Sequence, residues 1–286
     1  MKTIINNSLD ASFWFALEEY VMKTEKFCDE YFLFWNTVPT LMIGRFQNTL
    51  QEINADFVRN NNMQVIRRNS GGGTIYTDPA TWQFSFITWK QQGEAKDFKE
   101  FTKPVIEALQ QLGVPAEFNN RNDILAGGKK FSGNAQAVRR NRILHHGTLL
   151  FDTDLNMLST VLAPGPGKLI GKGIDSVRSR VTNLRPLLKN DMTTAEFLNG
   201  LASFFLDSGC DSGALSKKAN GVISALRRTK YGSHMWTYGE NPAYEFFNED
   251  RFPCGEVTVG FDCSDGRISG LKIGGDFLLK RSTREL

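Results

Sequence analysis

Three consecutive glycines, Gly71 to Gly73, lie at the centre of the segment that most constrains this chain. Glycine has no side chain to hold a ligand away, and its backbone adopts angles that are closed to other residues. Arg67 and Arg68 stand just before the glycines, and guanidinium groups pair well with phosphate and carboxylate oxygens. The segment predicts a turn at which bare backbone meets an anionic ligand, although a plain hairpin turn explains the glycines equally well.

The glycine-rich segment lacks the features of the two common nucleotide-binding loops. No Gly-Lys-Ser/Thr follows at the spacing of a P-loop, and no Gly-x-Gly-x-x-Gly opens a helix here. The chain has a formal net charge of only +3, and its arginines and lysines occur in small clusters. This pattern favours a small anionic ligand over a nucleic acid, which requires a broad basic surface.

Length, cysteine usage and hydropathy narrow the class of protein. The 286 residues, 41% of them hydrophobic, suffice for one large domain or for a large and a small one. Cys28, Cys210, Cys254 and Cys263 form no Cys-x-x-Cys pair, so neither a zinc site nor a disulfide framework is predicted. Without a secretory signal or a long apolar run, the expected protein is cytoplasmic and does not cross a membrane.

Two further segments combine glycine with basic and polar residues. The first reads RNDILAGGKKFSGNA at residues 121–135 and is followed by HHGTLL at residues 145–150. The second reads KGIDSVRSRVTNL at residues 172–184. Together with RRNSGGGTIYTD at residues 67–78, these segments resemble the marks of the lipoate-protein ligase A family, in the same order and at plausible spacing. The resemblance extends from about Asn6 to about Leu279.

The fold class follows from the order in which helical and strand patterns of hydrophobic residues occur along the chain. Helical and strand patterns mix without a regular βαβ repeat, which predicts an α+β fold. The resemblance implies a mixed sheet with flanking helices, similar to the catalytic domains of biotin ligases and class II aminoacyl-tRNA synthetases. It places that catalytic domain at residues 1–238 and a partial C-terminal accessory domain, with a short strand segment, at residues 239–286. Helices that usually complete the accessory domain do not follow, so a separate accessory domain is a possible partner.

Two local patterns give expectations that a structure can check. A helix is predicted to begin at a cap formed by Ser8 or Asp10 and to end at about Lys23, and one face of it carries Phe13, Ala16, Leu17 and Tyr20. A hairpin is predicted over residues 131–152, with residues 139–142 at its exposed tip.

The resemblance implies an ATP-dependent lipoate:protein ligase. The lipoate carboxylate would attack the α-phosphorus of ATP to give lipoyl-AMP, and a lysine amine would then displace AMP. The expected small molecules are lipoate, ATP and Mg²⁺. The expected acceptors are lipoyl domains of 2-oxoacid dehydrogenase complexes and the H protein of the glycine cleavage system.

The resemblance also assigns the site residues. The spacing Lys-x-Ser-Gly selects Lys130 over Lys129 as the catalytic cation, which would bind the lipoate carboxylate and stabilise the later oxyanion. The residues expected to bind ATP or the adenylate are Arg68, Ser70, Gly71, Gly72, Gly73, Thr74, Ile75, Tyr76, Asn122, Asp123, Lys172, Ser176 and Arg178. Besides Lys130, the residues expected to bind lipoate are Ser132, Gly133, Ala135, His146, Gly147 and Thr148. Asp123 is the candidate magnesium ligand, although a turn explains Asn122-Asp123 almost as well.

Three details qualify these assignments. His145 and His146 are adjacent on a predicted strand and point to opposite faces, so they are not expected to share a metal ion. The stretch around Lys172 to Arg178 suits a lid over the adenylate or a basic surface loop. Thr77 stands where the family often has histidine, whereas Asp78 matches the family.

Two rival activities remain from the same fold family. An octanoyltransferase would require a nucleophilic cysteine in the pocket, and the sequence has none between Cys28 and Cys210. A lipoyltransferase that uses preformed lipoyl-AMP stays open. A lipoate-binding protein without activity would have no need of the adenylate-binding residues.

Overall fold

The computed structural model describes residues 1–4, 6–24, 30–89, 97–119, 121–162, 180–207, 211–212, 215–239, 246–264 and 267–277. Its largest sheet has eight strands in the order β11-β1-β2-β6-β10-β9-β8-β7. Only the β11-β1 and β1-β2 pairs are parallel, so the sheet is mixed. The strands are β1 (Lys2–Ile4), β2 (Tyr31–Trp35), β6 (Thr81–Trp89), β7 (Ala116–Phe118), β8 (Asp123–Ala126), β9 (Lys129–Arg139), β10 (Arg142–Leu150) and β11 (Asp211–Ser212).

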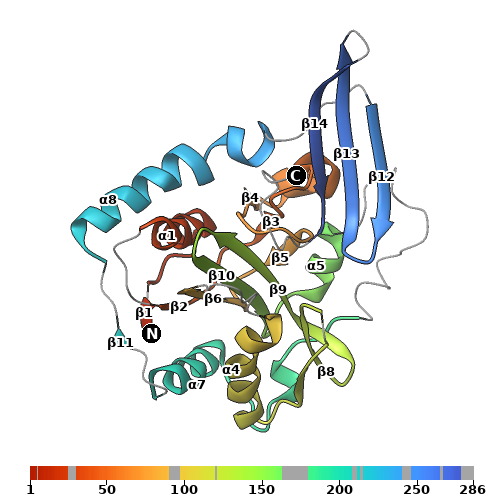
Figure 1. Cartoon of the computed structure of the whole chain (residues 1–286). Helices are drawn as coiled ribbons and strands as arrows, with labels where there is room; N and C mark the ends of the chain where they lie inside the picture. The colour runs from red at the N-terminus through yellow and green to blue at the C-terminus, as the bar shows by residue number, and fades with distance from the viewer. Residues whose placement is uncertain are drawn as a thin grey trace.

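Helices cover both faces of this sheet, which gives three layers (Figure 1). Helices α4 (Phe98–Gln111) and α7 (Thr194–Asp207) pack on one face around Phe32, Phe86 and Phe101. Helices α1 (Ala11–Lys23) and α8 (Lys217–Leu226) pack on the other face around Trp14 and Ile87. The predicted α+β fold with a mixed sheet and flanking helices is confirmed.

Two smaller sheets accompany the central one. Strands β4 (Gln64–Arg67) and β5 (Ile75–Thr77) flank β3 (Thr40–Ile43), so the three-glycine loop connects two strands of one sheet. The C-terminal sheet consists of β12 (Phe246–Phe252), β13 (Gly255–Ser264) and β14 (Arg267–Gly275). Sequence analysis placed strands at β13 and β14 and missed β12. The division of the chain after residue 238 stays a prediction.

The other helical elements in the described part of the chain are short. They are α2 (Thr49–Glu52), α3 (Ala55–Asn60), α5 (Leu155–Val161), a 3₁₀ turn at Arg185–Leu187, and two π-helical turns at Arg227–Tyr231 and Met235–Gly239. None of the helices in the described part of the chain is both long and apolar enough to cross a membrane.

Of the two predicted caps of helix α1, Asp10 is the one in the structure, because its side chain accepts a hydrogen bond from the Ser12 amide at 2.8 Å. The buried face of the helix is wider than predicted. Phe13 and Tyr20 are only half-buried, whereas Glu18 and Glu19 are buried. The helix contacts the sheet on one side and α8 on the other, so it has two buried sides rather than one.

The predicted hairpin is present as β9 and β10, but one residue of its tip is placed wrongly. Arg139 and Arg140 are exposed, and Arg140 has a positive φ of 51° in the turn. Arg142 is buried, with its guanidinium 4.2 Å from the centre of the Trp89 ring on the neighbouring strand. A cation–π contact therefore helps to hold this arginine inside the sheet.

Candidate active site

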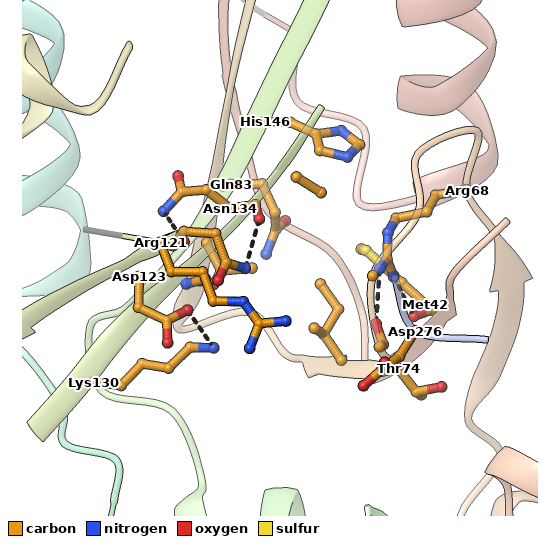
Figure 2. Close-up of a pocket in the computed structure, with 18 of the residues that line it drawn as sticks. Met42, Arg68, Thr74, Gln83, Arg121, Asp123, Lys130, Asn134, His146 and Asp276 are labelled. Carbon is orange, nitrogen blue, oxygen red and sulfur yellow. Dashed lines mark hydrogen bonds and ion pairs between the residues drawn. The ribbon is translucent and has the colours of Figure 1, made fainter. Parts of the chain in front are cut away.

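A cavity of about 290 Å³ lies among the central sheet, the glycine loop and the C-terminal segment (Figure 2). Thirteen residues predicted for the site line it: Arg68, Gly72, Gly73, Thr74, Ile75, Asn122, Asp123, Lys130, Gly133, Ala135, His146, Gly147 and Thr148. Seven lining residues were not predicted: Phe15, Trp35, Met42, Gln83, Arg121, Asn134 and Asp276. Two of the segments that sequence analysis combined, residues 67–78 and residues 121–150, thus meet at one place.

The other predicted residues do not line this cavity. Ser70, Tyr76 and Ser132 are buried, and Gly71 lies within the loop against the carbonyl of Phe277. Lys172, Ser176 and Arg178, together with the predicted lid, lie outside the described residues.

Arg68 shapes the glycine loop from inside. Its guanidinium donates to the carbonyl oxygens of Met42, Gly71 and Gly73 at 2.7–2.9 Å and to the Ser70 hydroxyl at 3.1 Å. Burial lowers the pKa of Arg68 to about 10, while the nearby Glu18 opposes this effect, so the side chain stays charged at neutral pH. The arginine therefore both folds the loop and places a positive charge at the cavity wall.

The C-terminal segment from Gly275 to Phe277 packs against the same glycine loop. The Gly72 amide donates to the Phe277 carbonyl at 3.2 Å, and Gly72 has a φ of 92° that favours glycine. The rings of Phe46 and Phe277 stack with centroids 5.3 Å apart, and the Gly275 amide donates to the Phe46 carbonyl at 3.0 Å. Asp276 is thereby held at the cavity, opposite the residues of β8 and β9 in the view of Figure 2.

A chain of buried polar groups crosses the wall between the loop and α1. Trp35 Nε1 donates to the Ser85 hydroxyl at 3.1 Å, and that hydroxyl donates to Glu18 Oε1 at 2.7 Å. His146 Nδ1 lies 3.1 Å from the same carboxylate oxygen, and His146 Nε2 lies 2.6 Å from the Ser70 hydroxyl. Four buried side chains thus fix the ring of His146 at the cavity and tie it to the glycine loop.

His145 occupies the opposite face of β10, as the alternation of a strand requires. Its ring stacks on Phe101 with centroids 4.7 Å apart, and its nitrogens contact Gln136 at 3.0 Å and Asn134 at 3.2 Å. Burial lowers the pKa of His145 well below 6.5, and the neighbouring His146 adds to this effect. The prediction that the two histidines point to opposite faces is confirmed.

The buried, neutral state of His145 predicts a loss of stability in mild acid. Below about pH 6.5 the unfolded chain binds a proton at this residue and the folded chain does not, so the free energy of unfolding falls as pH falls. The expected contribution is up to about 1.4 kcal/mol per pH unit. We therefore expect the free energy of unfolding, measured in urea between pH 7.5 and 5.5, to depend less on pH in His145→Gln than in the wild type. The exposed His234→Gln is the control, and an unchanged slope in His145→Gln would contradict the assignment.

Lys130 lies at the end of the cavity formed by β8 and β9. Its ammonium contacts Asp123 Oδ1 at 2.8 Å, and the two side chains are 40% and 22% exposed. The backbone of Lys130 is fixed by hydrogen bonds to Arg180 and Thr182 at 2.8 and 2.9 Å. A Cβ atom at Gly133 would lie 2.9 Å from the Lys130 ammonium, so glycine there leaves room for the lysine side chain. Arg121 extends into the same end in Figure 2.

Asp78, the last residue of the first motif, has a structural task. Its carboxylate accepts hydrogen bonds from the Ala80 amide at 3.0 Å, the Thr81 hydroxyl at 2.9 Å and the Asp154 amide at 3.0 Å. It thus fixes the turn before β6 and the start of α5. Thr77 is buried beside it and shares a hydrogen bond of 2.7 Å with Thr37.

Comparison with known proteins identifies the family. The model of the lipoyl protein ligase A/B catalytic domain matches residues 10–206, and the model of the bacterial lipoate protein ligase C-terminus matches residues 241–286. The chain belongs to the lipoate-protein ligase family. Lipoate–protein ligase 1 of Staphylococcus aureus is 39% identical over 279 residues, a match that covers 97% of this chain and 85% of that protein.

Two solved members of the family share the fold. A chain from the bi-partite lipoate protein ligase of Thermoplasma acidophilum, studied with its E2 lipoyl domain, has a TM-score of 0.76 and 25% identity, and the match covers 86% of this chain and 98% of that one. A crystal structure of lipoate-protein ligase A bound with ATP has a TM-score of 0.72 and 26% identity, with 83% of this chain and 98% of that chain covered.

Proposed function

We propose that this protein activates lipoate with ATP to form lipoyl-AMP and then transfers the lipoyl group to a lysine of a lipoyl domain. The observation that carries the proposal is the composition of the cavity wall. Cations gather at the end that holds Lys130 and Arg121, while Phe15, Trp35 and Met42 supply apolar surface. An amphiphilic acid such as lipoate needs both, and membership of the ligase family supports this substrate.

Activation is needed because a carboxylate is a poor electrophile. Its oxygen attacks the α-phosphorus of ATP, the bond to pyrophosphate breaks, and the mixed anhydride lipoyl-AMP remains. Lys130 would neutralise the lipoate carboxylate and then donate a hydrogen bond to the carbonyl oxygen of the adenylate. The loop from Arg68 to Thr74 would hold the nucleotide beside fixed positive charge, and a solved relative with bound ATP supports this use of the fold.

In the second step a lysine amine attacks the carbonyl carbon of lipoyl-AMP and AMP leaves. Lys130 would stabilise the oxyanion that forms during this attack. Lipoyl domains of 2-oxoacid dehydrogenase complexes and the glycine cleavage H protein are the proposed acceptors, supported by the archaeal relative that was studied with its E2 lipoyl domain.

The side chains at the cavity fit Mg²⁺ only when the phosphates of the nucleotide supply most of the oxygen ligands. Among the described residues, no group of three or more His, Cys, Asp or Glu side chains is placed to hold a metal ion. Asp123 offers one carboxylate at the cavity, and Mg²⁺ is commonly held by one or two carboxylates together with substrate phosphates. We propose that Asp123 contributes this carboxylate, and that the ion, when bound, would neutralise phosphate charge.

The rival octanoyltransferase activity requires a thiol at the acyl group. In the described part of the chain, the residues that line the cavity include no cysteine. Cys28 and Cys210 lie outside the described residues. Arg68 and Lys130 supply positive charge at the cavity wall, which supports an adenylate over a cysteine-linked intermediate.

The direct test uses the purified protein, an apo lipoyl domain and lipoate. With ATP and Mg²⁺, intact-mass measurement should show one lipoyl group on one lysine of the acceptor, and omission of ATP should abolish it. An ATP-independent transfer, or an acyl thioester trapped on a cysteine of the enzyme, would refute the proposal.

A further inference from the structure

Gln83 carries a buried carbonyl oxygen that has no hydrogen-bond partner among the residues that the structure describes. The side chain lines the cavity, is 3% exposed, and comes from the middle of the central sheet. Its amide nitrogen donates to the Thr81 carbonyl at 3.0 Å, whereas its Oε1 atom is buried and unpaired. A buried acceptor without a donor destabilises the folded protein, so such a group is expected to serve a ligand.

The orientation of this amide is fixed by its neighbour. The two ends of a glutamine side chain look alike, and hydrogen bonds must distinguish them. The Thr81 carbonyl is only an acceptor, so the Gln83 atom that lies 3.0 Å from it must be the nitrogen. The oxygen is therefore the atom for which the described residues supply no donor.

Strand register places Gln83 in the floor of the cavity. Gln83 is directly opposite Trp35 on β2 and Thr148 on β10, and all three line the cavity. Lys130, the proposed partner of the carboxylate, comes from the other end, on β9 (Figure 2). A bound acid with its carboxylate at Lys130 would thus direct its tail towards Gln83 and the apolar wall formed by Trp35 and Phe15.

We propose that Gln83 is a specificity-determining residue that favours acids whose buried tail carries a hydrogen-bond donor. This inference rests on the proposed function. A plain acyl chain and the disulfide ring of oxidised lipoate offer no N–H, O–H or S–H group to the Gln83 oxygen. The reduced dithiol form of lipoate offers two S–H donors. A site with a buried polar group rejects the analogue that leaves this group unpaired, and one such bond corresponds to about a tenfold preference.

Calorimetric titration of the whole protein with four acids tests the proposal. The acids are octanoate, octanoate with a terminal hydroxyl, oxidised lipoate and reduced lipoate, the last measured without oxygen. The wild type should bind the hydroxylated acid about tenfold more tightly than octanoate, and reduced lipoate more tightly than oxidised lipoate. Gln83→Met keeps the length of the side chain and removes the oxygen, so it should abolish both preferences while octanoate still binds.

Gln110→Met is the matched control, because it makes the same exchange at an exposed position of α4 and should keep both preferences. If Gln83→Met fails to fold, as judged by thermal unfolding, the comparison of acids on the wild type and on Gln83→Leu replaces it. Equal affinity of the wild type for donor-bearing and donor-free acids would overturn the role of Gln83 and leave the proposed function intact. Preferences that persist in the Gln83 variant would overturn it as well. A wild type that binds none of the four acids would refute the proposed function itself.

Discussion

Replacing Lys130 by alanine is expected to lower the rate of lipoyl transfer by about 10²–10³, the usual effect of removing one group that stabilises an oxyanion. Lys130 lines the cavity and lies 2.8 Å from Asp123, and its backbone is fixed by two hydrogen bonds. The substitution removes the charge that the carboxylate and the later oxyanion would contact. The affinity for lipoate should fall as well, because the same ammonium meets the substrate before it reacts.

Lys129→Ala is the matched control for this prediction. Lys129 precedes Lys130 on β9, is exposed, and does not line the cavity. Adjacent residues of a strand point to opposite faces, so its loss should leave the rate close to that of the wild type. Single-turnover transfer from synthetic lipoyl-AMP to an apo lipoyl domain measures the second step alone. Small and equal effects of the two substitutions would show that Lys130 is not the catalytic cation.

Arg67→Met is expected to lower the free energy of unfolding by about 3–5 kcal/mol. Arg67 is completely buried, and its guanidinium donates to six acceptors from two distant segments. Those acceptors are the carbonyl oxygens of Gly44, Arg45, Gln47, Trp236 and Thr237 and the hydroxyl of Thr49, at 2.6–3.2 Å. Methionine fills much of the space but removes all six of these hydrogen bonds, and only some of the acceptors, such as the carbonyl oxygens of Gly44 and Thr237, keep another donor.

Urea denaturation followed by tryptophan fluorescence measures this loss. Arg59→Met is the matched exchange at an exposed position, since the Arg59 side chain is 76% exposed in its ion pair with Asp56. It should change the free energy of unfolding by no more than about 0.5 kcal/mol. If Arg67→Met were as stable as Arg59→Met, the six hydrogen bonds would not hold the two segments together.

The two adjacent arginines, Arg67 and Arg68, show what the sequence motif predicts and what it does not. The sequence treats Arg67 and Arg68 as neighbouring cations beside a glycine turn, and the family pattern selects Arg68 for the nucleotide. In the structure Arg68 lines the cavity. The guanidinium of Arg67 instead donates hydrogen bonds to other parts of the protein, including the carbonyl oxygen of Thr237. A local sequence pattern does not identify hydrogen-bond acceptors 170 residues away. The structural role of Arg67 therefore could not be predicted.

Helix α1 illustrates the same limit for burial. Its cap at Asp10 and its length follow from local residues. Glu18 and Glu19 are buried because partners from β6, β10 and the segment after α8 surround them, among them Ser85, His146 and Tyr231. Hydrogen bonds from Lys23, Lys230 and Tyr231 outweigh the effect of burial and lower the pKa of Glu19 to about 2. Such compensation depends on tertiary contacts, which hydrophobic periodicity does not contain.

The floor of the cavity was not predicted for a related reason. Gly73 and Lys130 belong to segments with unusual composition, rich in glycine and basic residues, so the sequence identifies them. Trp35 and Gln83 lie in plain apolar strands, and they reach the cavity only because β2 pairs with β6 in one register. A shift by one residue would turn Gln83 to the opposite face of the sheet.

The central claim, activation of lipoate through an adenylate, is tested most directly by exchange of labelled pyrophosphate into ATP. The measurement needs only the protein, Mg²⁺, ATP, pyrophosphate and lipoate, and no acceptor domain. The account predicts that label enters ATP only when lipoate is present, because reversal of lipoyl-AMP formation is the step that incorporates it. Exchange without lipoate, or no exchange while the protein still transfers lipoyl groups from supplied lipoyl-AMP, would contradict the claim.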